Sequence, residues 1–129
     1  MEKYWISIDA LDFEITLRNT ETAKKIIKNL PIKGECQKWG KEFYFYTDLK
    51  IPLEETAKQV ISFGEIAYWP AGDAIAIGYG RTPLSVGNEI RLADKCNIWA
   101  ETKFDLNKLE NLLNPKIILI NNNSQHNES

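Results

Sequence analysis

Apolar and polar residues alternate over many short stretches of this chain. In residues 3–9, for example, Tyr4, Ile6 and Ile8 occupy every second position. A period of two places such residues on one face of a β-strand. On this basis the sequence predicts eight strands, over 3–9, 12–18, 34–39, 42–47, 65–69, 73–79, 97–103 and 116–120.

The pattern changes to a helical period in two places. The first apolar stripe comprises Ala23, Ile26, Ile27 and Leu30. Thr20 or Asn19 can accept hydrogen bonds from the first free N–H groups of this helix, and Pro31 marks its end. A second short helix is predicted over 105–113, with Asp105 as its cap and four leucines on its apolar face.

Two internal segments and the C-terminus lack a clear strand or helix pattern. Residues 49–63 could form one helical turn, but Pro52 favours an irregular connection. Residues 80–96 are predicted to form a long connection. The polar stretch 121–129 has no apolar anchor, so we expect a disordered tail after a single domain over 1–120.

The predicted fold class is mainly β. Eight short antiparallel strands can close into a barrel, which removes exposed sheet edges. Each helix has one apolar stripe to bury, so we expect the two helices to cap the open barrel ends.

Charge and composition narrow the class of protein. The formal net charge is −2, with 43% hydrophobic and 26% charged residues, which is typical of a globular domain. Nucleic-acid binding requires a clear excess of Lys and Arg, which is absent. No run approaches the ~18 apolar residues of a membrane span, and the N-terminus lacks the apolar region of a secretion signal. We therefore expect a cytoplasmic protein without nucleic-acid or membrane partners.

Few catalytic chemistries are open to this composition. The single histidine, His126, lies in the predicted tail, which argues against serine–histidine, cysteine–histidine and zinc–histidine mechanisms. Cys36 and Cys96 are far apart and lack zinc-ligand spacing, so we interpret them as small buried side chains, with a disulfide or a reactive thiol as the alternative. No glycine-rich phosphate loop is present. We expect neither a metal nor a cofactor.

Aromatic residues on one predicted strand indicate a binding surface. Phe43 and Phe45 share one face and would point into the barrel, which leaves Glu42, Tyr44 and Tyr46 on the outside. Rings with a polar tip suit a ligand groove there, although the tyrosines could instead pack under 49–63.

Trp69 is predicted to join this outer surface from the neighbouring hairpin. In that arrangement Ile66 and Tyr68 face inward and Glu65 faces water. Glu42 and Glu65 could form a carboxylate pair, but solvated charges at strand edges are the favoured interpretation.

Two arginines in the long connection are further candidates. Arg81 and Arg91 could each donate to a ligand, because a guanidinium stays charged and holds a fixed orientation. Prolyl isomerisation needs only such a donor and an apolar pocket, since its barrier comes from amide resonance. The alternative is that both arginines are solvated loop charges or form local salt bridges.

Several phrases resemble a family of small prokaryotic cyclophilin-like proteins of unknown function. They are L-x-N-T-x-T-A followed by L-P (17–31), W-G-x-E-F-Y-F (39–45), G-E-I-A-Y-W-P-A-G-D-A-I-A-I-G-Y-G-R-T-P (64–83) and N-I-W-A (97–100). The resemblance covers 3–120 and implies the cyclophilin barrel. True cyclophilins are peptidyl-prolyl isomerases, but their Phe-His-Arg and Gln-Phe-Phe segments are missing here, so their catalytic arginine has no counterpart by motif.

Three functions follow from these residues and from the resemblance. The leading one is binding of a peptide or small ligand in an aromatic groove on the barrel exterior, formed by Glu42, Tyr44, Tyr46, Trp69, Arg81 and Arg91. The first alternative is a peptidyl-prolyl isomerase with an atypical site. The second is a small-molecule enzyme or enzyme subunit, since similar barrels occur in proteins that resemble allophanate hydrolase subunits. The sequence does not indicate an oligomeric state.

Overall fold

The computed structural model describes residues 2–123. Within this range the chain forms ten strands, one α-helix and one 3-10 helix. In chain order they are β1 (Tyr4–Ile8), β2 (Leu11–Leu17), α1 (Glu21–Lys28), β3 (Ile32–Glu35), β4 (Gln37–Lys38), β5 (Glu42–Tyr46), β6 (Lys58–Ile61), β7 (Glu65–Trp69), β8 (Ala74–Gly78), β9 (Ile90–Glu101), η1 (Leu106–Asn111) and β10 (Ile117–Asn121).

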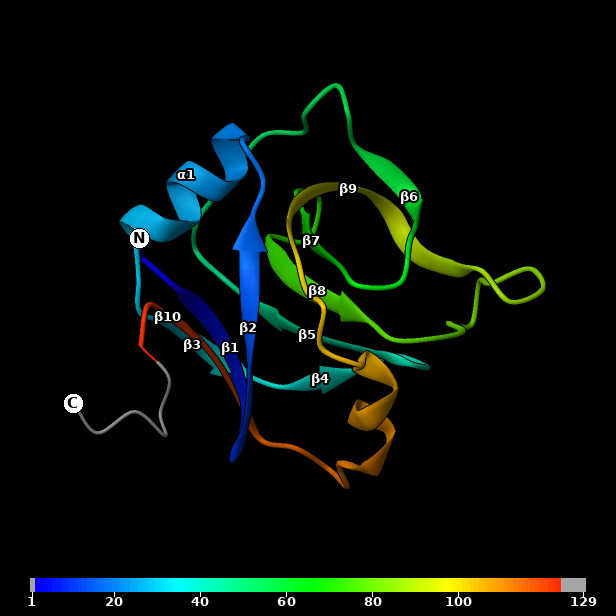
Figure 1. Cartoon of the computed structure of the whole chain (residues 1–129). Helices are drawn as coiled ribbons and strands as arrows, with labels where there is room; N and C mark the ends of the chain where they lie inside the picture. Colours follow the sequence, from blue (N-terminus) through cyan, green and yellow to red (C-terminus); the bar gives the residue numbers. More distant parts are fainter. Residues whose placement is uncertain (1, 124–129) are drawn as a thin grey trace.

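The strands form an antiparallel, nearly closed barrel (Figure 1). Neighbouring strands follow the order β3-β10-β1-β2-β9-β7-β8-β5-β4, and β6 pairs with β9 off this path. The two ends of the path, β3 and β4, are separated in the chain only by Cys36. Residues 32–38 thus pair with β10 on one side and β5 on the other, and bring the two ends together. The prediction of a mainly β antiparallel barrel is confirmed.

The barrel interior is filled by the inward faces of the alternating strands. Phe43 and Phe45 on β5 and Trp99 on β9 are among its largest buried side chains. Tyr68 is also fully buried, and its hydroxyl donates to Asp73 at 2.6 Å. The prediction that both phenylalanines and Tyr68 point inward is therefore confirmed.

Both helices pack on this core. Ala23 and Ile26 of α1 and Leu106 and Leu109 of η1 belong to the same buried cluster. Figure 1 shows α1 at the upper left and η1, in orange, at the lower right. The predicted caps are present, since the Thr20 side chain accepts from the Ala23 N–H and Asp105 accepts from the Asn107 N–H. The second helix is a short 3-10 helix rather than the longer helix predicted.

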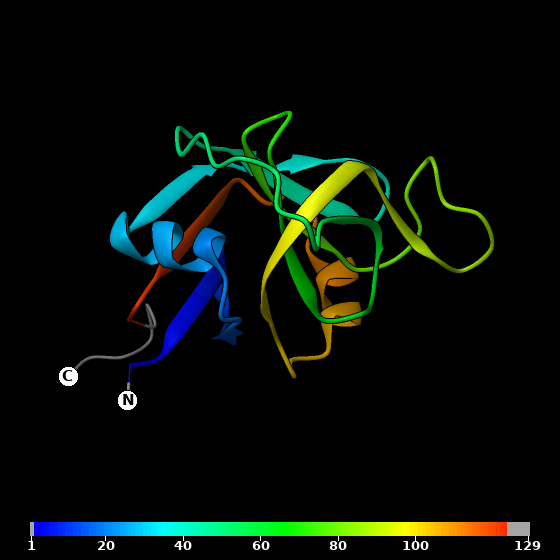
Figure 2. The same cartoon turned by 90° about the horizontal axis from the view of Figure 1, so that it is seen from above.

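Two segments that were predicted to be irregular contain strands. Residues 49–63 include β6, and the predicted connection 80–96 ends in the first half of β9, which is 12 residues long. Figure 2 shows the remaining loop, 80–89 in yellow-green, projecting from the side opposite α1. The strand count is ten rather than eight because β6 is added and the predicted strand 34–39 is divided into β3 and β4. The expected tail lies outside the described residues from position 124 onward, and Asn121 still pairs with Trp5 in β10.

A second apolar layer lies on the outer face of β7 and β8. There β6 and the first half of β9 pack over small side chains, which alternate along the strand with side chains that point into the barrel core. Gly78 permits this approach, because a Cβ at that position would lie 2.7 Å from Ile90 Cγ2. The buried members of this outer layer are Ile61, Ala67, Ala76, Ile90, Leu92, Cys96 and Ile98.

Candidate functional site

A valley between aromatic walls runs along the outer face of β5, β8 and β7. Ala74 on β8 lies between Tyr46 on β5 and Trp69 on β7, because it is directly opposite both in the strand registers. Ala76 likewise lies opposite Tyr44. Small residues on the middle strand form the floor of this valley, and the rings on the flanking strands form its sides.

The first half of β9 and the β4–β5 turn complete a pocket of about 230 Å³ over this floor. Trp39 reaches it from the turn, in which Gly40 has a φ of 60°. We call this cavity the Glu42 pocket. Its lining residues are Trp39, Glu42, Tyr44, Tyr46, Trp69, Ala74, Ala76, Leu92, Ala93 and Cys96.

Glu42 is buried in this pocket rather than solvated, so the favoured interpretation of its position was wrong. Only 6% of the Glu42 surface is exposed. Among residues 2–123, its Oε1 atom has no hydrogen-bond partner. Burial penalises the charged form and raises the pKa of Glu42 to about 7. A carboxyl group with this pKa exchanges its proton near neutral pH.

Glu65 has the same 6% exposure but the opposite environment. Its carboxylate forms an ion pair with Lys58 at 2.8 Å and another with Arg18 at 2.9 Å. Burial favours a higher pKa, but hydrogen bonds from Lys58, the Ser62 N–H and Arg18 outweigh it, so the pKa of Glu65 is lowered. Glu65 lines a separate polar cavity with Arg18. The prediction that it faces water was wrong, and its burial is explained by structural ion pairs.

The aromatic residues lie where the strand pattern placed them. Tyr46 is 57% exposed, whereas Tyr44 is half-buried against the outer apolar layer that includes Ile61. The alternative of packing under 49–63 does not hold for the exposed Tyr46; Tyr44 packs on the outer layer, to which 49–63 contributes Ile61. The two rings meet edge to face with centroids 5.6 Å apart. Burial, followed by the Tyr46 hydroxyl, raises the pKa of Tyr44.

Trp69 is fixed by the turn that follows it. A Cβ on Gly72 would lie 2.2 Å from two carbons of the Trp69 ring, so only glycine lets the indole lie over this turn. Within the part of the chain that the structure describes, the buried Nε1 atom of Trp69 has no hydrogen-bond acceptor. The pocket lining therefore includes two residues with unpaired polar atoms, Glu42 and Trp69.

Cys96 contributes a thiol to the pocket wall. It is 1% exposed, and burial, together with the charge of Glu42, raises its pKa to about 12. A thiol with such a pKa remains protonated near neutral pH and is a poor nucleophile. Cys36 and Cys96 are both free, so they form no disulfide.

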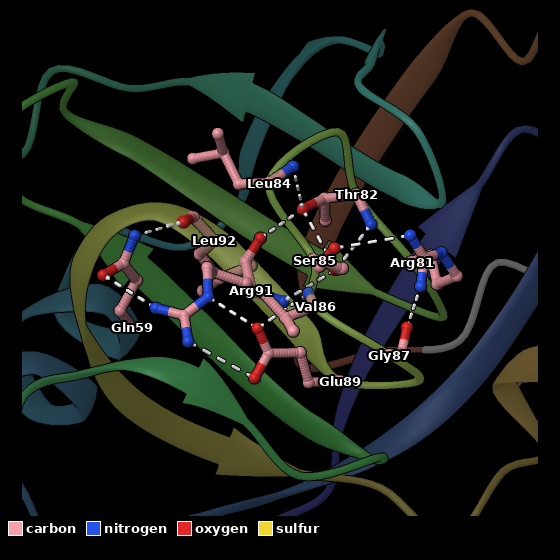
Figure 3. Close-up of polar contacts among 10 residues, drawn as sticks. All are labelled: Gln59, Arg81, Thr82, Leu84, Ser85, Val86, Gly87, Glu89, Arg91 and Leu92. Carbon is pink, nitrogen blue, oxygen red and sulfur yellow. Dashed lines mark hydrogen bonds and ion pairs between the residues drawn. The ribbon is translucent and has the colours of Figure 1, made fainter.

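Arg81 is held by its own loop, residues 80–89 (Figure 3). Its guanidinium donates to the carbonyl of Ser85 at 3.3 Å and to that of Gly87. Its backbone carbonyl accepts from the Lys41 N–H at 2.8 Å, which ties the loop to the turn beside Glu42. The Arg81 side chain stabilises the loop and does not line the Glu42 pocket.

Arg91 is also engaged outside the pocket (Figure 3). It donates from Nε to Glu89 Oε1 at 2.6 Å and from Nη1 to Gln59 Oε1 at 3.4 Å. The Gln59 amide in turn donates to the carbonyl of Leu92 at 3.0 Å. The alternative of local salt bridges therefore describes Arg91, which supports the β9 wall from behind.

Four of the six candidate residues lie together in the structure, and residues of the opposite wall were not among the candidates. Glu42, Tyr44, Tyr46 and Trp69 line one pocket, whereas neither arginine does. The contribution of Leu92 and Cys96 was missed, because 80–96 was interpreted as a connection. The run of small residues at alternate positions of β8 was the signal that something packs there.

The described residues contain neither a metal cluster nor a spanning helix. No group of three or more His, Cys, Asp or Glu side chains within 2–123 is arranged to hold a metal ion. In the same range, no helix has the length and apolar character needed to cross a membrane.

Comparisons with known proteins identify the family. The family described as cyclophilin-like matches residues 2–120. The solution structure of the hypothetical protein AF2241 from Archaeoglobus fulgidus is similar, with a TM-score of 0.78 and 29% sequence identity over 95% of both chains. No protein with a curated description matches the sequence. Because the family match spans nearly the whole chain and agrees with the barrel, this protein belongs to the cyclophilin-like family.

Proposed function

We propose that this protein binds a small organic molecule in the Glu42 pocket. The observation that carries this proposal is a nearly buried carboxyl group, in an aromatic-lined cavity, with one oxygen unpaired. Largely apolar pockets with a few convergent polar groups are the usual form of small-molecule sites. Glu42 and Trp69 supply such polar groups here.

A purely structural role explains Glu42 poorly. A buried acceptor without a partner costs roughly 1–3 kcal/mol, and an apolar residue would avoid that cost. Glu65 shows how a buried carboxylate with a structural role is paired in this fold, since Lys58 and Arg18 both form ion pairs with it. The unpaired Glu42 therefore supports a group held ready for a ligand.

The size of the cavity favours a small molecule over a length of peptide. Its volume of about 230 Å³ is below the ~300–1,000 Å³ typical of drug-sized sites. A bound peptide could place only one side chain in it. A prolyl isomerase site would also need a donor beside the pocket, and both candidate arginines are engaged elsewhere. Isomerase activity is therefore the less favoured alternative.

A fragment screen, monitored by NMR through the indole N–H signals of the tryptophans, tests this proposal. Trp39 and Trp69 line the pocket, while Trp5 and Trp99 do not, so the protein contains its own control signals. Binding should shift the first two and leave the last two in place. Ala76→Leu, which fills the pocket floor, should abolish these shifts in a variant that remains folded. Shifts spread equally over all four indoles, or unchanged binding by Ala76→Leu, would contradict the proposal.

A further inference from the structure

We propose that the Glu42 pocket selects ligands that carry a protonated amine, with the Glu42 carboxylate as the counter-ion. This inference rests on the proposed binding function and names the ligand class. It stands on the charge and the walls of the cavity, which together distinguish cationic from neutral and anionic ligands.

The pocket lacks an internal partner for Glu42. Of the described residues that line it, Glu42 alone has a charged side chain. Lys41 pairs with Glu110, Lys58 with Glu65, and Arg91 with Glu89. Lys38 and Lys95 adjoin Trp39 and Cys96 in the chain, but neither lines the pocket. A cation that enters with the ligand would supply the missing counter-charge.

The pocket walls also favour a cation. Rings from Trp39, Tyr44, Tyr46 and Trp69 line a cavity of about 230 Å³. Aromatic faces attract ammonium groups through the ring quadrupole, most strongly for tryptophan and where water is excluded. An anion would meet the same faces and a carboxyl group unfavourably, so carboxylate ligands should be rejected.

Amine binding should release a proton from Glu42 in neutral or mildly acidic solution. The free carboxyl group has a pKa of about 7, and an adjacent ammonium group would lower it. The other titratable side chains lining the pocket are Tyr44 and Tyr46 from β5 and Cys96 from β9; β7 and β8 contribute none. Burial raises the pKa values of Tyr44 and Cys96, so both stay uncharged in this range.

Three ring compounds of similar size separate the possibilities: benzylamine, benzyl alcohol and benzoate. Near pH 8, with Glu42 mostly ionised, benzylamine should bind at least about tenfold more tightly than either analogue. Its affinity should fall by about tenfold per pH unit below about 7, because Glu42 must first lose its proton. Calorimetry in buffers with different ionisation enthalpies should detect that proton.

Glu42→Gln should remove the preference for benzylamine. Glu65→Gln is the matched control, because this glutamate is equally buried but lines another cavity, and it should leave the preference intact. Equal or tighter binding of benzyl alcohol or benzoate at the pocket would overturn the amine inference and leave the binding function standing. Benzylamine affinity independent of pH would overturn it as well. If neither the three probes nor a fragment screen shifts Trp39 or Trp69, the binding function itself fails.

Discussion

Replacing Glu42 with glutamine should stabilise the protein above neutral pH and leave its stability nearly unchanged in mild acid. Glutamine has almost the shape of a protonated glutamate but cannot ionise. At low pH the two side chains therefore present similar uncharged groups to the pocket. At high pH the wild-type protein must hold an unpaired carboxylate, whereas the variant does not.

The size of this effect follows from the pKa of Glu42. Burial raises it from the ordinary 4.5 to about 7, and each pH unit is worth about 1.36 kcal/mol. Because the folded pKa is the higher one, the stabilising contribution of protonated Glu42 is complete below the unfolded pKa. It is lost as the pH rises through the folded value. Relative to glutamine, wild type should lose about 3 kcal/mol of unfolding free energy between about pH 4.5 and pH 8.

Urea unfolding, followed by tryptophan fluorescence from mild acid to about pH 8, measures this difference. Glu65→Gln is again the control, because ion pairs lower the pKa of Glu65. That variant should lose about 1–3 kcal/mol at neutral pH and less in acid, which is the opposite trend. A gap between wild type and Glu42→Gln that is independent of pH would show that Glu42 does not titrate as a buried, unpaired carboxyl group. So would a glutamine variant less stable than wild type near pH 8.

Three further changes test the surroundings of the pocket. Gly72→Ala should displace the Trp69 ring and cost about 1–3 kcal/mol, seen as a shifted Trp69 indole signal with that of Trp99 unchanged. Asp73→Asn should cost about 2–4 kcal/mol in neutral urea unfolding, because the Asp73 carboxylate accepts from two hydroxyls and two backbone N–H groups. Hydrogen bonds outweigh burial and lower the Asp73 pKa, so this cost should shrink as the pH falls below 3.8; a cost that grows in acid would contradict it. Proline-peptide isomerisation should proceed at the buffer rate with wild type, Arg81→Ala and Arg91→Ala, and catalysis lost in either variant would restore an isomerase.

The barrel could be predicted because its strands place large apolar side chains toward the core at every second position. The outer layer could not, because its strands break that rule. In β9 the residues Ala93, Asp94 and Lys95 are exposed in succession, which hides the strand period. In β6 the pairing with β9 shifts between Lys58 and Val60, which also disturbs the pattern.

For the candidate site, too, the local strand pattern predicted orientation, whereas burial and ion pairing depended on the tertiary fold. The strand period correctly oriented Tyr44 and Trp69, because orientation is a local property of the chain. The burial of Glu42 depends on Trp39 and on the first half of β9, which are brought together only by the tertiary fold. Glu65 is buried with partners that include Arg18, which directly follows β2 and is distant in the chain, and no local pattern indicates such a pair.

An NMR titration of the Glu42 side-chain carboxyl carbon, without and with benzylamine, tests most directly whether Glu42 is an unpaired carboxyl group that binds an amine. We expect a pKa near 7 in the free protein, because the carboxyl group is buried without a partner. With saturating benzylamine, the same signal should titrate at a clearly lower pH, while Glu65 stays unchanged. A free Glu42 that titrates near 4.5, or a pKa that benzylamine does not lower, would contradict this role of Glu42.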